Sequence, residues 1–400
     1  AQPGRQSPFA SLPAAAATAA ATTAAAGATT VVVVVVEVAA AAAAAPMMSA
    51  SALETAARPP LPWPPVPVRL REGLADEPVE PLPEDLERVE LTLGMSFGSE
   101  EGARRAINDF KVRPTDVIID TFGKTGTTLL QWICHQLRTG GHVDFDDLYQ
   151  VSPWIIMAYD MGLDPNVAGA EYTPRVFKSH LRLSMVYPGC KYIVSVRKPS
   201  TTIISGYNFL LNKGVPGFAD MTVSEYALQG TSINGAGTPD RAGMFTTYKE
   251  FWQARDCSSV LVLVYEDLVK DMATQIRLIA DFIGVVPSPE LIERVTAMST
   301  KDFMSKYESQ LDESWVHERA KKLDRSPHPE MWTAAPRVVV NKHKDGLSDE
   351  AQKFLEDQWR EKFAPDTGFE TYEEFSRFFS ERNAKKSARI AATYSASSAN

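Results

Sequence analysis

One local pattern occurs three times in the chain: a short apolar run, then polar residues, then apolar residues at helical spacing. The runs are Val117–Asp120, Lys191–Val196 and Val260–Val264. Runs of this length are typical of strands buried in a parallel sheet. Alternation of such strands with helices places helices on both faces of the sheet. The expected fold class is therefore α/β, with a P-loop-like parallel sheet between two layers of helices.

The three expected helices are bounded by glycine or proline, which supply ordinary stop and start signals. They cover residues 129–137, 201–211 and 276–283. In parallel α/β sheets, ligands bind beyond the carboxyl ends of the strands. The polar clusters that follow the three strands should therefore form one site. These clusters are residues 123–128, 197–205 and 265–267.

The loop at residues 123–128 has the composition of an anion site. A glycine-containing turn that opens a helix exposes backbone N–H groups. Lys124 adds a positive charge, and three threonines add hydroxyl donors. The loop is not a Walker A sequence, because that motif would need glycine where Ile118 stands. We expect a bound phosphate here, but not an NTP-hydrolysing P-loop.

Lys178 and His180 lie two residues apart in an extended stretch, residues 174–181, so their side chains point to the same face. The cation disfavours the imidazolium form of the neighbouring ring. A neutral imidazole of this kind is a candidate general base. The alternative is that His180 is a structural histidine.

Arg197 ends the second strand, and Ser205 lies one or two turns into the helix that follows. Because Arg can bind a phosphate through two parallel N–H bonds, this pair is a candidate clamp for a second phosphate. A salt bridge beside a helix hydroxyl is the alternative. Residues 337–346 form a basic run that is either a further phosphate contact or a solvated loop.

In this order the segments resemble the cytosolic-type sulfotransferase family, from about Pro114 to Phe363. The family's motifs are a Lys-Ser-Gly-Thr-Thr loop, a Lys-Ser-His strand, an Arg-x-Pro followed by Ser, and a Tyr-Glu-Asp-Leu after a strand. The matching positions are Lys124–Thr128, Lys178–His180, Arg197, Pro199, Ser205 and Tyr265–Leu268. The resemblance implies transfer of a sulfuryl group from 3′-phosphoadenosine-5′-phosphosulfate (PAPS) to a hydroxyl or amine of a small molecule.

The resemblance also implies binding roles. Arg197 and Ser205 would hold the 3′-phosphate, and Tyr265 would contact the adenine region. The residues that would hold the 5′-phosphosulfate are Lys124, Thr125, Gly126, Thr127 and Thr128.

In catalysis, the resemblance implies that His180 takes the proton of the acceptor. Lys124 and Lys178 would stabilise charge on the transferring group. Sulfuryl transfer resembles in-line phosphoryl transfer, in which positioning and electrostatics do most of the catalysis. The sulfuryl group carries less charge than a phosphoryl group, so we expect no metal.

The chain departs from the family at two places. Leu129 stands where the family usually has a Trp that stacks on adenine, and Trp132, one turn later, is a candidate substitute. The late Arg-Lys-Gly-x-x-Gly phosphate loop is matched imperfectly by residues 341–346, where Asn341 replaces the Arg. The positions still expected to contribute there are Lys342, Lys344 and Gly346.

The net charge and the cysteine content restrict the binding partners and the cellular compartment that we expect. The net charge is −9, from 50 acidic and 41 basic residues, which argues against nucleic acid or polyanionic glycan as a partner. Cys134, Cys190 and Cys257 are far apart, so neither a disulfide framework nor a zinc site is expected. A reducing, cytoplasmic location is the default expectation. A homodimer stays open.

Four segments are expected. Residues 1–58 are a low-complexity Ala/Val-rich arm, expected to be disordered. A membrane anchor is less favoured, because Glu37 would be costly at the bilayer centre. A transit or signal segment is a second, equally disfavoured alternative. Met47-Met48, directly after the Ala run, is our hypothesis for the native start. The remaining segments are a Pro-rich linker or surface strap at 59–95, the sulfotransferase domain at 96–385 and a disordered tail at 386–400.

Loops at 144–160 and 213–241 are expected to form the acceptor pocket, with residues 230–243 as a mobile lid. The aromatic candidates for its lining are Phe145, Trp154, Tyr159 and Phe218. Three other functions stay open. They are a catalytically degenerate, nucleotide-binding relative of the sulfotransferases, a P-loop small-molecule kinase, and a membrane enzyme that modifies glycosaminoglycans.

Overall fold

The computed structural model describes residues 64–84, 86, 98–185, 187–235, 243–325 and 346–397. The chain divides into two units, residues 1–56 and 57–400, and every described residue belongs to the second. The predictions made for the low-complexity arm, for Lys342 and for Lys344 fall outside the described residues.

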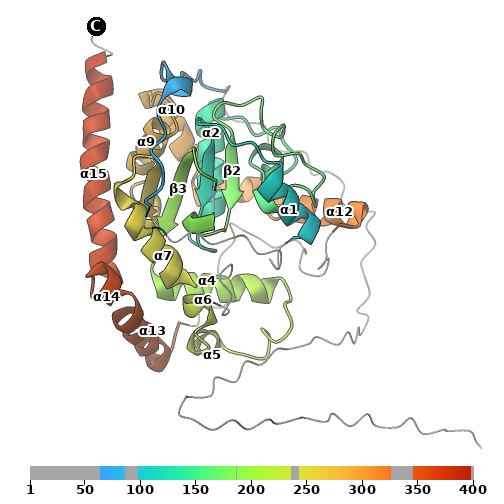
Figure 1. Ribbon diagram of the computed structural model, residues 1–400, viewed down its shortest axis with the longest axis vertical. Helices are drawn as coiled ribbons and strands as arrows, with labels where there is room; N and C mark the ends of the chain where they lie inside the picture. Colours follow the sequence, from blue (N-terminus) through green and yellow to red (C-terminus); the bar gives the residue numbers. More distant parts are fainter. Residues whose placement is uncertain are drawn as a thin grey trace, which may run out of the picture. The chain divides into compact units, whose positions relative to one another are not determined.

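A parallel four-stranded sheet forms the centre of the described unit (Figure 1), with the strand order β2-β1-β3-β4. Its strands are β1 (Val117–Asp120), β2 (Val176–Ser179), β3 (Lys191–Val196) and β4 (Val260–Val264). The three strands predicted from apolar runs are confirmed with the expected bounds. β2, which contains Lys178, lies beside β1, and Asp120 is opposite Ser179. The segments after these two strands therefore begin side by side.

Helices surround the sheet. Those of eight residues or more are α1 (Glu100–Asn108), α2 (Thr127–Thr139), α4 (Pro199–Asn212), α7 (Met244–Gln253), α9 (Met272–Phe282), α10 (Pro289–Met298), α12 (Ser314–Leu323), α13 (Asp349–Lys362) and α15 (Tyr372–Ser397). The shorter α-helices are α3 (Leu148–Val151), α5 (Val223–Leu228), α6 (Thr231–Asn234), α8 (Tyr265–Lys270), α11 (Lys301–Met304) and α14 (Ala364–Thr367). Short 3₁₀ turns are η1 (Leu74–Asp76), η2 (Ile155–Met157), η3 (Leu183–Met185), η5 (Ala254–Asp256) and η6 (Ser305–Gln310).

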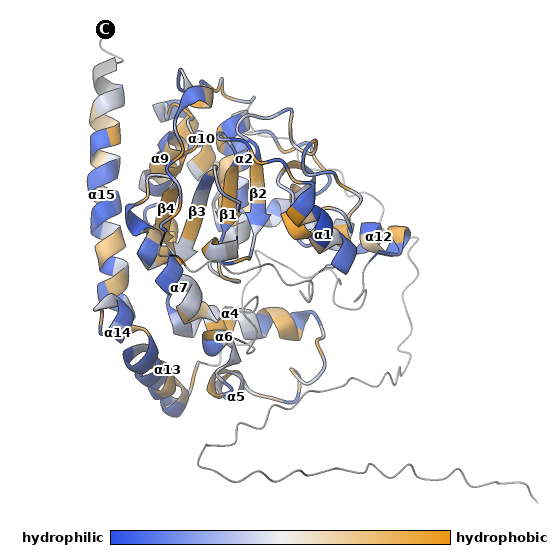
Figure 2. Cartoon of the chain, in the orientation of Figure 1, coloured by the Kyte–Doolittle hydropathy of each residue, from blue (hydrophilic) through white to orange (hydrophobic). Residues whose placement is uncertain are grey.

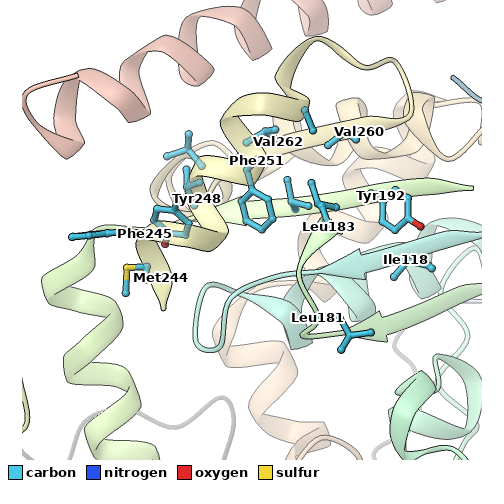
Figure 3. Packing of buried hydrophobic residues seen from close by; sticks show 14 of the residues in the cluster. Ile118, Leu181, Leu183, Tyr192, Met244, Phe245, Tyr248, Phe251, Val260 and Val262 are labelled. Carbon is cyan, nitrogen blue, oxygen red and sulfur yellow. The ribbon is translucent and has the colours of Figure 1, made fainter. Parts of the chain in front are cut away.

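Alternate strand residues enter different cores, as the two-residue period of a strand requires. Ile119 and Leu263 pack with α2, α9 and α10 on one face. Ile118 and Val262 pack with α7, α13 and α15 on the other. Figure 3 shows Phe251 of α7 close to Val262, and Figure 2 shows β1 and β4 as mainly hydrophobic. Helices on both faces confirm the predicted α/β class.

The Pro-rich segment is a strap rather than a free linker where it is described. The Val66 N–H donates to the Gly140 carbonyl at 2.8 Å. Leu70 forms an isolated antiparallel bridge with Val285. Of the two alternatives for this segment, residues 64–84 therefore follow the one that packs on the domain.

The tail expected to be disordered from residue 386 is helical instead, because α15 continues to Ser397. α15 packs against α9 and β4, and Ser387 and Ile390 are buried. The Asn383 side chain also donates to the Val262 carbonyl at 3.0 Å. A local sequence pattern does not show these contacts, because α9 and β4 lie far from α15 in the sequence. No helix in the described ranges combines the length and apolarity of a membrane span.

Candidate active site

A cavity of about 680 Å³ opens at the carboxyl ends of the strands. Its wall includes residues from the loop after β1, the segment after β2, the start of α4 and the start of α8. The sequence-predicted residues that line it are Lys124, Gly126, Thr127, Thr128, Lys178, His180, Arg197, Ser205 and Tyr265. The three polar clusters predicted to meet at one edge of the sheet do so.

The loop after β1 leads into the open N-terminus of α2. Gly126 precedes the helix with a φ of +107°. Because glycine has no side chain, this residue leaves the first amides of α2 without a side-chain cap. A Cβ at position 126 would lie 2.9 Å from the Tyr265 ring, so this site needs glycine for space as well as for φ. The N-terminus of this 13-residue helix has the geometry that suits an anion.

Lys124 lies in the middle of the loop with a φ of +70°, a conformation that is uncommon outside glycine. Its ammonium nitrogen lies 4.2 Å from the centre of the Phe209 ring. The Arg197 guanidinium donates to its carbonyl oxygen at 2.7 Å. These contacts, from α4 and from the residue after β3, hold the loop, and Lys124 borders the cavity.

The three threonines of the loop differ in position. Thr127 lines the cavity and its hydroxyl lies 2.6 Å from that of Thr121. Thr128 also lines the cavity. Thr125 does not: its hydroxyl donates to the Phe122 carbonyl at 2.8 Å and lies 2.9 Å from the Ser195 hydroxyl. Its side chain points into the fold, so the structure does not support the ligand contact expected of Thr125.

His180 follows β2 and borders the cavity. Its Nδ1 atom lies 2.7 Å from the Thr121 carbonyl oxygen. A carbonyl only accepts hydrogen bonds, so Nδ1 carries the hydrogen and a neutral ring has its lone pair at Nε2. The Trp154 ring packs edge-on against the imidazole, with 5.3 Å between ring centres. The site thus fixes both the tautomer and the plane of the ring.

Lys178 lies on β2 and is 4% exposed. Its ammonium nitrogen donates to the Tyr149 hydroxyl at 2.5 Å and lies 3.8 Å from the centre of the Trp154 ring. The Glu313 carboxylate is 4.0 Å away. Lys178 is thus held by an aromatic and acidic pocket at the cavity wall.

Arg197 lies over the Tyr265 ring, 4.2 Å from its centre. The Tyr248 hydroxyl accepts a hydrogen bond from the backbone N–H of Arg197 at 2.8 Å and donates one to the backbone carbonyl of Arg197 at 2.9 Å. Burial raises the pKa of Tyr248, which keeps that phenol protonated. Ser205, two turns into α4, lines the same cavity.

Several expected contributors lie elsewhere. Gly346 is exposed and does not border the cavity. Trp132 is fully buried, and its ring N–H donates to the Met298 carbonyl at 3.0 Å, so it does not replace the family Trp. Of the four aromatic candidates for the acceptor pocket, only Trp154 lines it. The others pack in the fold: Phe145 against Trp132, Tyr159 between Arg105 and Arg325, and Phe218 against Tyr207. Part of the expected lid, residues 236–242, lies outside the described residues.

Some residues of the cavity carry no sequence signal of their own. Ser299 has a buried hydroxyl with no hydrogen-bond partner among the described residues. The basic residues Arg182, Lys213 and Lys301 come from three different segments, and Glu313 from a fourth. Over the described lining there are six cationic side chains and one carboxylate. The cavity of this acidic protein is therefore locally positive, as an anionic ligand requires.

Comparisons with known proteins agree with the family resemblance seen in the sequence. A family model described as "Sulfotransferase domain" matches residues 114–367. Sulfotransferase 4A1 of Homo sapiens is 30% identical over 205 residues, which are 49% of this chain and 69% of that protein. The 3-alpha-hydroxysteroid sulfotransferase of Cavia porcellus is 30% identical over 220 residues, 52% of this chain and 73% of that protein.

A solved structure of retinol dehydratase, in complex with androsterone and the inactive cofactor PAP, has a similar fold. The TM-score is 0.50 at 18% identity, over 69% of this chain and 89% of that chain. The family match covers more than half of this chain, and the predicted resemblance is confirmed. The chain belongs to the sulfotransferase family, whose members transfer sulfuryl groups.

Proposed function

We propose that the protein transfers a sulfuryl group from PAPS to a hydroxyl, or an amine, of a small molecule, with His180 as general base. One observation carries the proposal: Lys124, the start of α2 and His180 border a single cavity. An anion bound at the N-terminus of α2 would then lie in the same cavity as a base and a lysine.

The cavity has the donors that PAPS would need. The amides of the first turn of α2, Thr127, Thr128 and Lys124 suit the 5′-phosphosulfate. Arg197 and Ser205 suit the 3′-phosphate. The Ser299 hydroxyl, which has no hydrogen-bond partner within the described part of the chain, and the Tyr265 ring would contact the adenine region. When bound, PAPS supplies an activated sulfuryl group with PAP as the leaving group.

His180 would act through Nε2. The carbonyl of Thr121 keeps the hydrogen on Nδ1, so Nε2 can accept the proton of the acceptor hydroxyl as that oxygen attacks sulfur in line. The Thr121 carbonyl would then stabilise the imidazolium that forms. A positioned base of this kind is worth about 10²–10⁴ in rate.

The lysines would stabilise charge. Lys124 borders the cavity from the anion loop, and Lys178 borders it beside His180. Both ammonium groups are fixed by aromatic rings at 4.2 Å and 3.8 Å, a geometry that limits their reorganisation during the reaction.

The acceptor would be a small, largely apolar alcohol or phenol. Apolar side chains of α4, of the segment after it and of the start of α7 line part of the cavity, including Ile203, Phe209, Leu210, Val215 and Met244. Androsterone, bound in the similar retinol dehydratase structure, is a ligand of this type for that protein. A cytoplasmic location stays a prediction.

The test uses the full chain with ³⁵S-labelled PAPS and a panel of phenols, alcohols and amines. We expect label in the acceptor, no loss of activity with EDTA, and strongly reduced transfer by Lys124→Ala. Absence of transfer to every acceptor, including a total small-molecule extract of the host, would reject the proposal.

The second candidate is a nucleotide-binding protein without turnover. Leu129 in place of the family Trp, together with the burial of Trp132 in the fold, favours it. Binding of PAP with no transfer in the same assay would support this candidate instead.

A further inference from the structure

The amino group of Lys178 belongs to a chain of side-chain contacts that extends to the residue before α12 and to the end of α4. Lys178 donates to the Tyr149 hydroxyl at 2.5 Å, and that hydroxyl donates to Glu313 Oε1 at 2.9 Å. The other carboxylate oxygen, Oε2, accepts from Lys213 at 3.0 Å. β2, α3, the end of α4 and the residue before α12 are thus connected through four side chains.

All four side chains are enclosed. Lys178 is 4% exposed and Glu313 is 3% exposed. Tyr149 is buried, and the side chain of Lys213 is 7% exposed. Because the groups lie in a poorly solvated environment, their charges interact strongly and their positions are well defined.

Glu313 also adopts a costly backbone conformation. It precedes α12 with a φ of +70°, where residues other than glycine are uncommon. Such a residue persists when its surroundings require it, often at a functional site. Both carboxylate oxygens are engaged from this position, on the wall of the same cavity that His180 borders.

We propose that Glu313 is a positioning residue for catalysis: through the Tyr149 hydroxyl, it holds the Lys178 ammonium at the reacting end of the cavity. Lys213 fixes the orientation of the carboxylate. The inference rests on the proposed function, in which Lys178 stabilises charge on the transferring group. Glu313 would then contribute to turnover through the position of the Lys178 ammonium.

The first test needs no turnover. Lysine acylation by N-hydroxysuccinimidyl acetate, followed by peptide mass spectrometry, reports how firmly the Lys178 ammonium is held. Loss of a charge 4.0 Å away should raise the labelling rate of Lys178 in Glu313→Gln by about tenfold. Tyr149→Phe, which removes the hydroxyl and no charge, should raise it as well. Glu250→Gln is the matched control, because Glu250 is an equally buried carboxylate that pairs with Arg182; Lys178 labelling should not change there.

The second test asks whether Glu313 acts through Lys178. With PAPS and an active acceptor, Glu313→Gln should lower kcat by about tenfold and leave the KM for PAPS unchanged. In a Lys178→Met background the same change should lower kcat no further, because its effect is already lost. Glu250→Gln should have the same proportional effect in both backgrounds. Thermal melting and PAP affinity establish that each variant is folded.

Two results would overturn the inference. One is Lys178 labelling at the wild-type rate in both Glu313→Gln and Tyr149→Phe. The other is an equal fall of kcat for Glu313→Gln with and without Lys178. If wild-type protein transfers nothing from PAPS, the proposed function fails instead, and the labelling result alone decides whether Glu313 holds Lys178.

Discussion

The Nδ1 atom of His180 lies 2.7 Å from the carbonyl oxygen of Thr121. The hydroxyl of the same threonine lies 2.6 Å from that of Thr127, in the first turn of α2. One residue thus connects the candidate base to the candidate anion site. A shift of the segment from Thr121 to Thr127 would therefore also displace the imidazole.

Leu129→Trp is expected to strengthen PAP binding. Leu129 lines the cavity at the position where the family has a stacking Trp. Stacking of a base on an aromatic ring is worth about 1–3 kcal/mol, which corresponds to a gain of about 5- to 150-fold in affinity. Calorimetric titration with PAP measures it. Leu129→Met, similar in volume but not aromatic, should leave the affinity unchanged. Equal PAP affinities for the wild type, Leu129→Trp and Leu129→Met would show that the adenine does not bind beside residue 129.

Arg197→Lys is expected to weaken PAP binding by about 10- to 100-fold, since hydrogen bonds to a charged group contribute about 1.5–3 kcal/mol and lysine lacks the planar fork. Arg197 also donates to the Lys124 carbonyl, so part of the loss would come from the loop. Arg382→Lys, at an exposed pair with Asp256, is the control and should bind PAP normally. Unchanged affinity in Arg197→Lys would remove Arg197 from the nucleotide site.

The strap should lose a stabilising ion pair in acid. A hydrogen bond from Arg71 lowers the pKa of Glu77 from 4.5 to about 2. A carboxyl whose folded pKa is depressed stabilises the fold above its unfolded pKa, and this contribution is lost as the pH falls from 4.5 towards 2. Urea unfolding should therefore show Glu77→Gln less stable than wild type near neutral pH, with the difference shrinking over that acid range. A difference that does not depend on pH would contradict the assignment.

Native protein is expected to present one reactive thiol. Burial raises the pKa of Cys134 and Cys190 to about 12, whereas Cys257 is partly exposed. Reaction with a chromogenic disulfide at neutral pH should titrate one group in the folded protein and three after denaturation, because thiolate is the reactive form. Cys257→Ser should give none before unfolding. Two rapidly reacting thiols in the native protein would show that the cores are looser than described.

Much of the architecture could be predicted from local patterns. The apolar run at β4 is typical of a buried strand, and parallel strands end at one edge of their sheet. That rule predicts one site for Lys124, Arg197 and Tyr265, and all three line the same cavity. The family motifs added the fold type and the match that was later found at residues 114–367.

Side-chain direction was less predictable. Thr125 belongs to the anion loop by sequence, yet its hydroxyl turns inward to Ser195. Trp132 lies on α2, and its ring packs in a core with Phe145 rather than in the cavity. Neither outcome follows from spacing alone, because each depends on packing against segments far away in the chain.

Long-range partners were not predictable at all. Glu313 reaches the cavity from the residue before α12, and nothing in its neighbourhood distinguishes it from a surface acid. The helical end of α15 was missed for a similar reason, since α15 packs against α9 and β4, which lie far away in the sequence.

The most direct test of the account combines turnover and binding in one variant, His180→Ala. We predict that transfer of sulfur-35 from PAPS falls by about 10²–10⁴, because the base is lost, while PAP affinity stays within about twofold of wild type. A parallel loss of PAP affinity would make His180 a structural residue, and transfer at the wild-type rate would show that the cavity's base lies elsewhere.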